Sequence, residues 1–386
     1  MIPYGRQAIS EADIAAVVEV LRSDFITQGP QIDRFEQNLA AYCGAAYGVA
    51  VCNATAALHI ACMALDVGPG KMVWTAANTF LASANCARYC GADVDFVDTD
   101  SDTYNMSVPA LKAKLEQARA AGRKLPDVVI PVHFAGQSPD MKGIAALGAE
   151  YGFRIIEDAS HAVGGDYLGG KIGNCRYSDM VVFSFHPVKI LTTGEGGMVM
   201  CRTPELSKAL RLLRSHGMTR VAEDLERKDE GPWYYEQALL GYNYRITDIQ
   251  AALGNSQFSR IDEFVARRRE LAARYDRLLQ GLPLRTPLQH PDGKSAFHLY
   301  PIWIDEEAAG RSRRAVFDAL RAAGIGVNVH YIPVYTQPDY RKLGFQAGLC
   351  PNAERYYAGA ISLPMYAALS DSEQDTVVAA VRGALA

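Results

Sequence analysis

The chain opens with apolar residues at helical spacing. They recur at intervals of three and four positions: Ile14, Val17, Val18 and Leu21. This spacing places them on one face of an amphipathic helix. Ser10 and Asp13 stand just before it and are typical of a helix N-terminus. Residues 27–30 (TQGP) are expected to end the helix as a loop.

From residue 47 onward, short β-rich runs alternate with helical runs. The predicted strands are 47–52, 72–75, 94–97, 128–132, 153–157, 180–185 and 197–201. The predicted helices lie between them, one beginning at Asn53 and others near 83–89, 109–121 and 141–151. Such alternation predicts an α/β fold, with a mostly parallel sheet and helices on both of its faces.

The alternation stops near residue 240. A helical stretch over 247–279 follows, and we interpret its charged run 267–270 as the solvated face of a helix that bridges two domains. The elements predicted beyond it are strands 298–304 and 326–330 and helices 311–323 and 371–385. The chain therefore divides into a large α/β domain, residues 1–246 with the N-terminal helical segment, and a smaller C-terminal α+β domain, residues 247–386.

Composition and charge narrow the class of protein. The 386 residues are 49% hydrophobic and 21% charged, which is typical of a folded globular chain. Because 39 basic residues face 43 acidic ones, the formal charge is −4, and a nucleic-acid partner is disfavoured. No apolar run has the length of a membrane span, and the N-terminus lacks the apolar core of a signal peptide. We expect a cytoplasmic protein with no membrane partner.

The cysteines point to the same compartment. The sequence holds 8 of them, with no C-x-x-C motif and no nearby paired histidines that would make a zinc site. We therefore expect no metal, and small buried thiols in a reducing environment.

Two glycine-rich segments resemble nucleotide-binding loops but lack their context. Residues 165–171 spell G-x-x-x-x-G-K, yet Ile172 stands where the loop needs Ser or Thr, so a glycine-rich hairpin is the better interpretation. No G-x-G-x-x-G follows a predicted strand, because Gly68 and Gly70 lead into a strand. A Rossmann dinucleotide site is therefore unsupported.

Two ionisable residues follow predicted strands. Asp158 comes directly after the strand 153–157, and Lys189 comes shortly after the strand 180–185. In open α/β sheets, ligands bind beyond the carboxyl ends of the strands. Either residue alone is usually an ordinary surface group. The informative feature is that both, with His161, fall at strand ends of one predicted sheet.

Pyridoxal phosphate (PLP) chemistry needs such a set. It requires a lysine for the Schiff base, a carboxylate that keeps the pyridine nitrogen protonated, and a phosphate-binding site. Lys189 and Asp158 are candidates for the first two. The segment Asn53-Ala54-Thr55 begins a helix after a strand, so its free N–H groups and the Thr55 hydroxyl suit a phosphate. Taken alone, this segment is better explained as a plain helix cap.

Longer motifs carry a resemblance. Residues 158–161 (DASH), 184–189 (SFHPVK), 192–197 (TTGEGG) and 241–252 (GYNYRITDIQAA) resemble the DegT/DnrJ/EryC1 family of sugar aminotransferases. These enzymes use PLP in the fold type I architecture. The resemblance covers nearly the whole chain, and it implies a PLP-dependent aminotransferase with shared active sites in a homodimer.

The resemblance also implies roles for individual residues. Lys189 would bind PLP covalently, Asp158 would pair with the pyridine nitrogen, and His161 would stack on the pyridine face. A core histidine making one hydrogen bond is an equal alternative for His161. The residues implied for the phosphate are Ala54, Thr55 and Ser184, with Asn243 reaching the phosphate in the neighbouring subunit.

Within the family, the chain most resembles the branch that acts in pseudaminic acid biosynthesis, through residues 185–187, 214–218 and 329–335. This implies L-glutamate as the amino donor and a UDP-linked 4-keto-6-deoxy-N-acetylhexosamine, UDP-2-acetamido-2,6-dideoxy-β-L-arabino-hex-4-ulose, as the acceptor. The candidate substrate contacts are Thr27, His216, His330 and Tyr331. Packing of loops, or of one domain against the other, is an equally good account of the histidines and tyrosine.

Three alternatives stay open. The chain could act on another nucleotide-linked keto sugar. A PLP-dependent sugar dehydratase is a second possibility, but relatives with that activity carry histidine where this chain has Lys189. A non-enzymatic regulator on the same fold would be expected to carry a basic DNA-binding module, and no segment supplies one.

Overall fold

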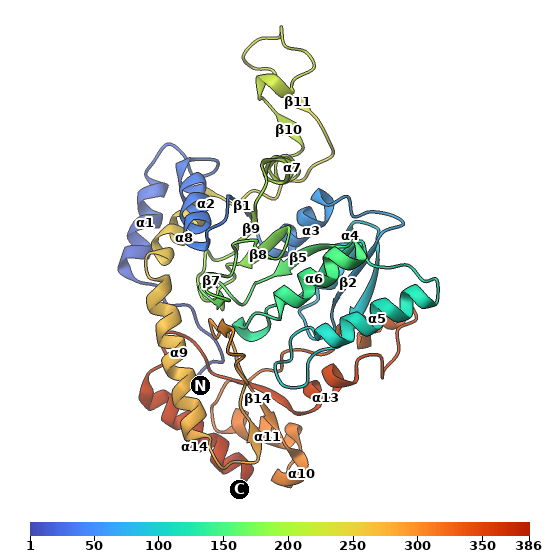
Figure 1. The fold of residues 1–386 in the computed structure, drawn as a ribbon. Coiled ribbons are helices and arrows are strands. Elements are labelled where there is room, and N and C mark those ends of the chain that lie inside the picture. The colour runs from blue at the N-terminus through green and yellow to red at the C-terminus, as the bar shows by residue number, and fades with distance from the viewer.

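A seven-stranded sheet forms the centre of the computed structural model, which describes residues 1–386 (Figure 1). Its strands, in spatial order, are β1 (Tyr47–Val51), β9 (Gly197–Cys201), β8 (Met180–Ser184), β5 (Arg154–Asp158), β4 (Val128–Ile130), β2 (Met72–Ala76) and β3 (Asp93–Val97). Only β9 runs antiparallel to its neighbours, β1 and β8, and every other pair is parallel. The prediction of a mostly parallel sheet is confirmed.

Both faces of this sheet are covered by helices, because its strands are apolar on both sides. Along β8, Val182 packs on one face, whereas Val181 and Phe183 pack on the other. The first face is covered by α3 (Ala54–Ala64), α4 (Ala82–Tyr89) and α7 (Pro204–Arg214). The opposite face is covered by α2 (Pro30–Cys43) and α8 (Asp248–Phe258) near β1, and by α5 (Val108–Ala120) and α6 (Met141–Tyr151) near β3.

A second, smaller layer lies at the other end of the molecule (Figure 1). It is an antiparallel sheet of β12 (Leu284–Arg285), β14 (Tyr300–Ile304) and β15 (Ala360–Leu363). Its apolar core is shared with α9 (Ile261–Leu278), α11 (Arg313–Ala322) and α14 (Asp371–Leu385). The N-terminus joins this layer, since the Ile2 N–H donates to the carbonyl oxygen of Gly324 at 2.9 Å.

The remaining elements are short, apart from the N-terminal helix. They are α1 (Glu11–Leu21), β6 (Asp166–Tyr167), β7 (Gly170–Lys171), β10 (Met218–Thr219), β11 (Glu236–Gln237), β13 (Gly293–Lys294), α10 (Glu306–Ala309), α12 (Pro338–Arg341), α13 (Pro351–Gly359), and the 3-10 turns η1 (Phe134–Gly136), η2 (Ala222–Asp224) and η3 (Val334–Thr336). The cap expected at Ser10 is present, because its side chain accepts from the Asp13 N–H. The glycine-rich hairpin expected at 165–171 is confirmed as the antiparallel pair β6–β7.

Four local expectations were incomplete or wrong. Helix α2 was not predicted, although its buried Ile32, Phe35 and Leu39 recur at helical spacing. The single helix expected over 247–279 is wrong, because the chain bends at residues 259–260 between α8 and α9. Arg260, which immediately precedes α9, forms a salt bridge with Asp13 at 2.5 Å.

The other two errors concern the C-terminal part. The strand expected at 326–330 is wrong, because Gly326 packs directly against the N-terminal backbone and only Asn328 bridges to β15, at Ser362. The charged run 267–270 is not a fully solvated face, because the Arg268 side chain is 98% buried. Its neighbours Arg267 and Glu270 do reach solvent.

The C-terminal part of the sequence also returns to the large sheet. Val334, Tyr335 and Cys350 belong to the apolar cluster that packs beneath α3 and α4. The Tyr335 ring lies 5.7 Å from that of Phe96 on β3. The core of the large sheet thus contains residues from both sides of position 246. The domain boundary predicted at that residue stays a prediction.

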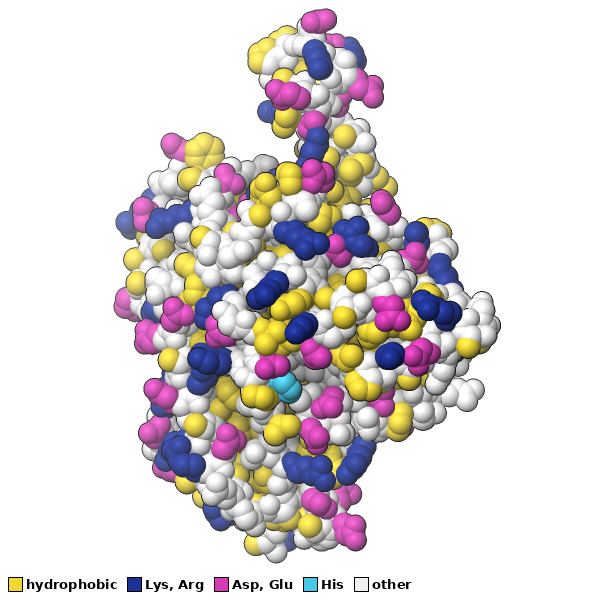
Figure 2. All heavy atoms as spheres, viewed as in Figure 1, with side chains coloured by type: hydrophobic (Ala, Val, Ile, Leu, Met, Phe, Trp, Pro, Cys, Tyr) yellow, Lys and Arg dark blue, Asp and Glu magenta, His cyan; other side chains and the backbone are white.

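The surface is mixed in charge, and one segment stands apart from the body. Figure 2 shows acidic and basic side chains spread over the visible face. Residues 215–243, with the small hairpin β10–β11, project from the end of α7 and are called the arm below (Figures 1 and 2). None of the helices combines the length and the apolar character that a bilayer crossing requires.

Candidate active site

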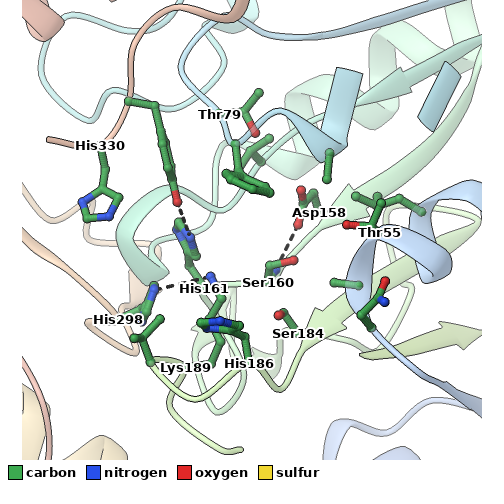
Figure 3. Close-up of a pocket in the computed structure, with 18 of the residues that line it drawn as sticks. Thr55, Thr79, Asp158, Ser160, His161, Ser184, His186, Lys189, His298 and His330 are labelled. Atoms are coloured by element: carbon green, nitrogen blue, oxygen red, sulfur yellow. Dashed lines mark hydrogen bonds between the residues drawn. The ribbon is translucent and has the colours of Figure 1, made fainter. Parts of the chain in front are cut away.

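A cavity of about 600 Å³ opens at the carboxyl ends of β5 and β8, beside the first turn of α3 (Figure 3). Ligands of open α/β sheets bind at this edge, beyond the carboxyl ends of the parallel strands. A volume of this size suits a small organic ligand. The predicted residues that line it are Ala54, Thr55, Asp158, His161, Ser184, Lys189, His330 and Tyr331. The structure therefore brings together eight residues from four separate stretches of sequence.

Asp158 is the last residue of β5 and is buried. The Ser83 hydroxyl donates to its Oδ2 at 2.5 Å, and the Ser160 N–H donates to its Oδ1 at 3.1 Å. A carboxylate has about four acceptor sites, so each oxygen keeps one for a ligand. The Asp158 side chain is thus fixed in direction and still able to pair with a protonated nitrogen.

Lys189 lies in the turn after β8, where its N–H donates to the His186 carbonyl oxygen at 2.8 Å. Burial lowers the pKa of Lys189 to about 8, and the charge of Asp158 partly offsets this by favouring the ammonium form. At pH 7 about one molecule in ten then carries the free amine, far more than for a solvated lysine. A partly deprotonated amine is what covalent chemistry on an aldehyde or ketone requires.

His161 is held as a neutral imidazole. The Ala135 N–H donates to its Nδ1 at 3.3 Å, so the ring proton sits on Nε2, which lies 3.1 Å from the Tyr331 hydroxyl oxygen. Burial, and after it the charge of Lys189, lowers the pKa of His161 well below its usual value. Because the Tyr331 oxygen accepts from His161, its own proton is free to donate into the cavity.

The first turn of α3 offers an anion-binding site. Asn53 caps the helix by accepting from the Ala56 N–H at 2.8 Å, and the first N–H groups of the helix, at Ala54 and Thr55, have no partner within it. The Ser184 hydroxyl stands nearby, at the end of β8. A Cβ atom at Gly197 would lie 2.6 Å from the Asn53 carbonyl carbon and 2.7 Å from the Ala54 nitrogen. Only glycine lets β9 approach the helix this closely.

This donor set fits PLP. One part of the cavity holds an amine of lowered pKa and a buried carboxylate, and another holds unpartnered helix N–H groups with two hydroxyls. These match the aldehyde, the pyridine nitrogen and the phosphate of that group. No group of His, Cys, Asp and Glu side chains is placed to hold a metal ion.

Three predicted residues lie away from the cavity. Thr27 is exposed in the loop between α1 and α2. His216 and Asn243 are exposed at the base of the arm, where Asn243 forms a bridge with Ser215. None of the three lines the cavity of its own chain.

Several lining residues escaped the sequence analysis. They are Tyr4, Thr79, Phe80, Ser160, His186, Glu195, His298 and Asn328. Ser160, His186 and Glu195 stand within the motifs 158–161, 184–189 and 192–197, so the motifs themselves were a usable signal. Asn328 directly precedes the segment 329–335 used above, whereas nothing in the local sequence of Tyr4 indicated the site.

The fold and the site define a PLP-dependent aminotransferase of fold type I. The model of the DegT/DnrJ/EryC1/StrS aminotransferase family matches residues 7–382. The chain belongs to this family, whose members depend on PLP.

Individual relatives support the same assignment. The spore coat polysaccharide biosynthesis protein SpsC of Bacillus subtilis is 40% identical over 384 residues, which cover 99% of this chain and 96% of that protein. Helicobacter pylori PseC, an aminotransferase involved in the biosynthesis of pseudaminic acid, superposes with a TM-score of 0.90 at 28% identity, covering 100% of this chain and 99% of that one. Spr1654 from Streptococcus pneumoniae, solved in its PLP form, superposes with a TM-score of 0.88 at 30% identity, covering 100% and 98% of the two chains.

Proposed function

We propose that this sugar aminotransferase moves an amino group from L-glutamate to the C4 keto carbon of a UDP-linked 4-keto-6-deoxy-N-acetylhexosamine, in the pseudaminic acid pathway. The observation that carries the proposal is the joint placement of Lys189, Asp158 and the α3 N-terminus around one cavity. The similarity to PseC over the full length of both chains supports the choice of sugar. The specific acceptor is UDP-2-acetamido-2,6-dideoxy-β-L-arabino-hex-4-ulose.

When bound, PLP supplies an electron sink for the carbon that loses its proton. Lys189 Nζ takes that proton from the α carbon of the amino donor and later returns one to C4 of the sugar, acting as general base and then as general acid. Its pKa of about 8 suits both roles near neutral pH. Asp158 would favour a protonated pyridine nitrogen through charge pairing, and His161 would pack against the ring.

The phosphate would be held by the Ala54 and Thr55 N–H groups, the Thr55 hydroxyl and the Ser184 hydroxyl. Tyr331 and His330 line the sugar side of the cavity, where the Tyr331 proton is free to donate. Thr27 and His216 do not line this cavity, and we assign them to the substrate site of a second copy.

We propose a homodimer for the same reason. Asn243 is exposed outside its own cavity, and the arm that carries it presents apolar side chains to solvent. Trp233 and Leu240 are 72% and 75% exposed. A second copy would cover them and receive Asn243 at its phosphate. We further propose a cytoplasmic location, supported by eight cysteines that are all unpaired.

The relative SpsC favours a second candidate acceptor. Its identity with this chain, 40%, exceeds the 28% of PseC, and its name refers to the biosynthesis of spore coat polysaccharide. The alternative is therefore a different nucleotide-linked keto sugar, aminated by the same residues.

The decisive experiment incubates the holoenzyme with ¹⁵N-labelled L-glutamate and a panel of nucleotide-linked keto sugars, followed by mass spectrometry of the sugar product. We expect label in the product from the UDP-4-keto-6-deoxy-N-acetyl sugar and none with the Lys189→Ala variant. Labelling of a different nucleotide sugar alone would select the second candidate. Efficient reaction with pyruvate or oxaloacetate, and with no nucleotide sugar, would contradict both.

A further inference from the structure

His298 reaches the Lys189 side chain from the C-terminal part of the chain. Its Nε2 lies 3.5 Å from Lys189 Nζ, and its ring centroid lies 4.4 Å from that of His161 (Figure 3). The residue is buried, and its second ring nitrogen, Nδ1, is buried without a hydrogen-bond partner. The only hydrogen-bond partner of the His298 side chain is therefore Lys189 Nζ.

Arg268, on α9, holds the backbone that carries His298. Its Nη1 donates to the carbonyl oxygens of Phe297 at 3.1 Å, His298 at 3.3 Å and Met365 at 2.9 Å. Burial lowers the pKa of this guanidinium to about 10, so it stays a cation at neutral pH. No salt bridge compensates it, and a buried unpaired charge is unfavourable unless carbonyl dipoles stabilise it. The three carbonyl groups stabilise the buried charge of Arg268, and the guanidinium in turn fixes the positions of these carbonyl groups.

The same segment is fastened from the opposite side by the turn η1. The Ala296 N–H donates to the Gly136 carbonyl oxygen at 3.0 Å, and the Leu299 N–H donates to that of Ala135 at 3.3 Å. A Cβ atom at Gly136, whose φ is +107°, would lie 2.7 Å from the Phe297 nitrogen. Because the Ala135 N–H also holds His161, one turn fixes both histidines relative to each other.

We propose that His298 is a further catalytic residue, the hydrogen-bond acceptor for Lys189 Nζ whenever that amine is free, and that Arg268 is its positioning residue. In this arrangement one Nζ–H donates to His298 Nε2, which requires the imidazole proton to sit on Nδ1, the buried ring nitrogen that has no hydrogen-bond partner. The nitrogen lone pair is then left pointing into the cavity, where it can take a proton. The catalytic consequence rests on the proposed function, whereas the contact itself does not.

The electrostatics of the cavity suit an acceptor at this position. Burial and, after it, the charge of Lys189 lower the pKa of His298 well below its usual value, so its imidazole stays neutral. The other titratable groups that line the cavity are Tyr4, Asp158, His161, His186, Glu195, His330 and Tyr331. Among the buried ones, Asp158 favours the Lys189 ammonium, while His161 and His330 are neutral because burial lowers their pKa values. Loss of the His298 acceptor should therefore lower the pKa of Lys189.

The test measures the pKa of Lys189 in the full chain after removal of the cofactor. The rate of trinitrophenylation of the Lys189 peptide is followed against pH by mass spectrometry. We expect a pKa near 8 for the parent chain and a value about one unit lower for His298→Leu, because an acceptor for a charged donor is lost. His298→Gln keeps an acceptor oxygen and should stay close to the parent value.

Kinetics of the holoenzyme provide a second measurement. His298→Leu should lower kcat about tenfold in the half-reaction with L-glutamate, with KM changed less than about twofold, and His298→Gln should recover most of that loss. Identical Lys189 pKa values in the Leu, Gln and parent proteins would overturn the proposal. The Lys189 pKa needs no substrate, so a failure of the proposed sugar or donor would leave this result interpretable.

Arg268→Met tests the positioning role, with Arg269→Met as the matched control one residue along α9. Arg269 also donates to backbone carbonyl groups, at Ser295 and Lys294, but its side chain is partly exposed and pairs with Asp166. We expect the lowered Lys189 pKa in Arg268→Met and not in Arg269→Met. An unchanged value in a folded Arg268→Met protein would contradict the role of Arg268. If that variant does not fold, the comparison of His298→Leu with His298→Gln still tests the main proposal.

Discussion

The carboxyl edge of the central sheet and the arm differ in whether the candidate functional residues have their partners within one chain. At the sheet edge, Asp158, His161 and Lys189 are each held by hydrogen bonds within the chain. In the arm, His216 and Asn243 are exposed and do not line the catalytic cavity of their own chain. The difference teaches that a single chain builds the covalent half of the site, whereas the residues of the arm would take part only through the sharing between subunits that we propose.

The arm is nevertheless firmly attached to the body. The carboxylate of Glu36, on α2, is buried and accepts from the Ala50 N–H at 2.8 Å. It also pairs with Arg211 at 2.6 Å and Arg214 at 2.5 Å, near the end of α7 where the arm begins. A fixed base can present Asn243 in a constant direction.

The largest expected effect comes from a substitution at the sheet edge, which a single chain completes. Lys189→Ala should lower turnover by about 10⁴-fold or more and abolish the visible absorbance of bound PLP, because the nucleophile and the proton carrier are lost together. In the parent protein, borohydride reduction should attach the pyridoxyl group to the Lys189 peptide. Lys171→Ala, in the neighbouring hairpin, should retain both properties. Labelling of a different lysine would refute the assignment.

Asp158→Asn should have the next largest effect. The amide cannot favour a protonated pyridine nitrogen, so we expect turnover to fall by about 10²- to 10³-fold while PLP stays bound. Steady-state kinetics and the visible spectrum measure the two properties separately. The control is Asp102→Asn, an exposed carboxylate outside the cavity. Near-normal turnover in Asp158→Asn would rule out its role.

Glu36→Gln tests the attachment of the arm. It leaves two guanidinium groups without their buried carboxylate, and we expect the free energy of unfolding to fall by about 2–3 kcal/mol, discounted because Arg211 is partly exposed. Urea denaturation followed by circular dichroism measures it. Glu19→Gln, exposed on α1, should change little. An equal loss in both variants would mean that the buried pairs add nothing.

The smallest effect concerns sharing between subunits. Lys189→Ala and Asn243→Ala chains are each expected to be inactive, but in a mixed dimer one of the two sites has both residues intact. Equal mixing after subunit exchange should restore about a quarter of the parent activity, since half of the dimers are mixed and each has one working site. No recovery, with exchange demonstrated by mass spectrometry, would show that Asn243 acts within its own chain or not at all.

The sequence predicted the sheet well because its strands are short, apolar and buried on both faces, as in β8. Asp158 and Lys189 followed from that success, since residues just after parallel strands share one edge. Ser184 was predicted through the family resemblance alone. The bend at residues 259–260 was not predictable from local propensity. It depends on Arg260 reaching Asp13, which lies far away along the chain.

Residues of the cavity that come from distant segments were harder to find. His298 follows no strand of the large sheet, and its contact with Lys189 exists only because Arg268 and η1 position its backbone. Arg268 itself stands in a run of charged residues that indicates a solvated surface. Its burial becomes evident only when three carbonyl groups converge on it.

The close approach at Gly197 also restricts how this protein can evolve. Every other amino acid carries a Cβ atom, and that atom would collide with backbone rather than with a movable side chain. No single substitution at this position therefore leaves the first turn of α3 where it is. Thr55 and Ser184 line the cavity with their hydroxyl groups and already carry a Cβ atom, so a substitution there need not place a new atom against backbone. The candidate phosphate site can therefore change during evolution through the side chains at residues 55 and 184, but not through a substitution at residue 197.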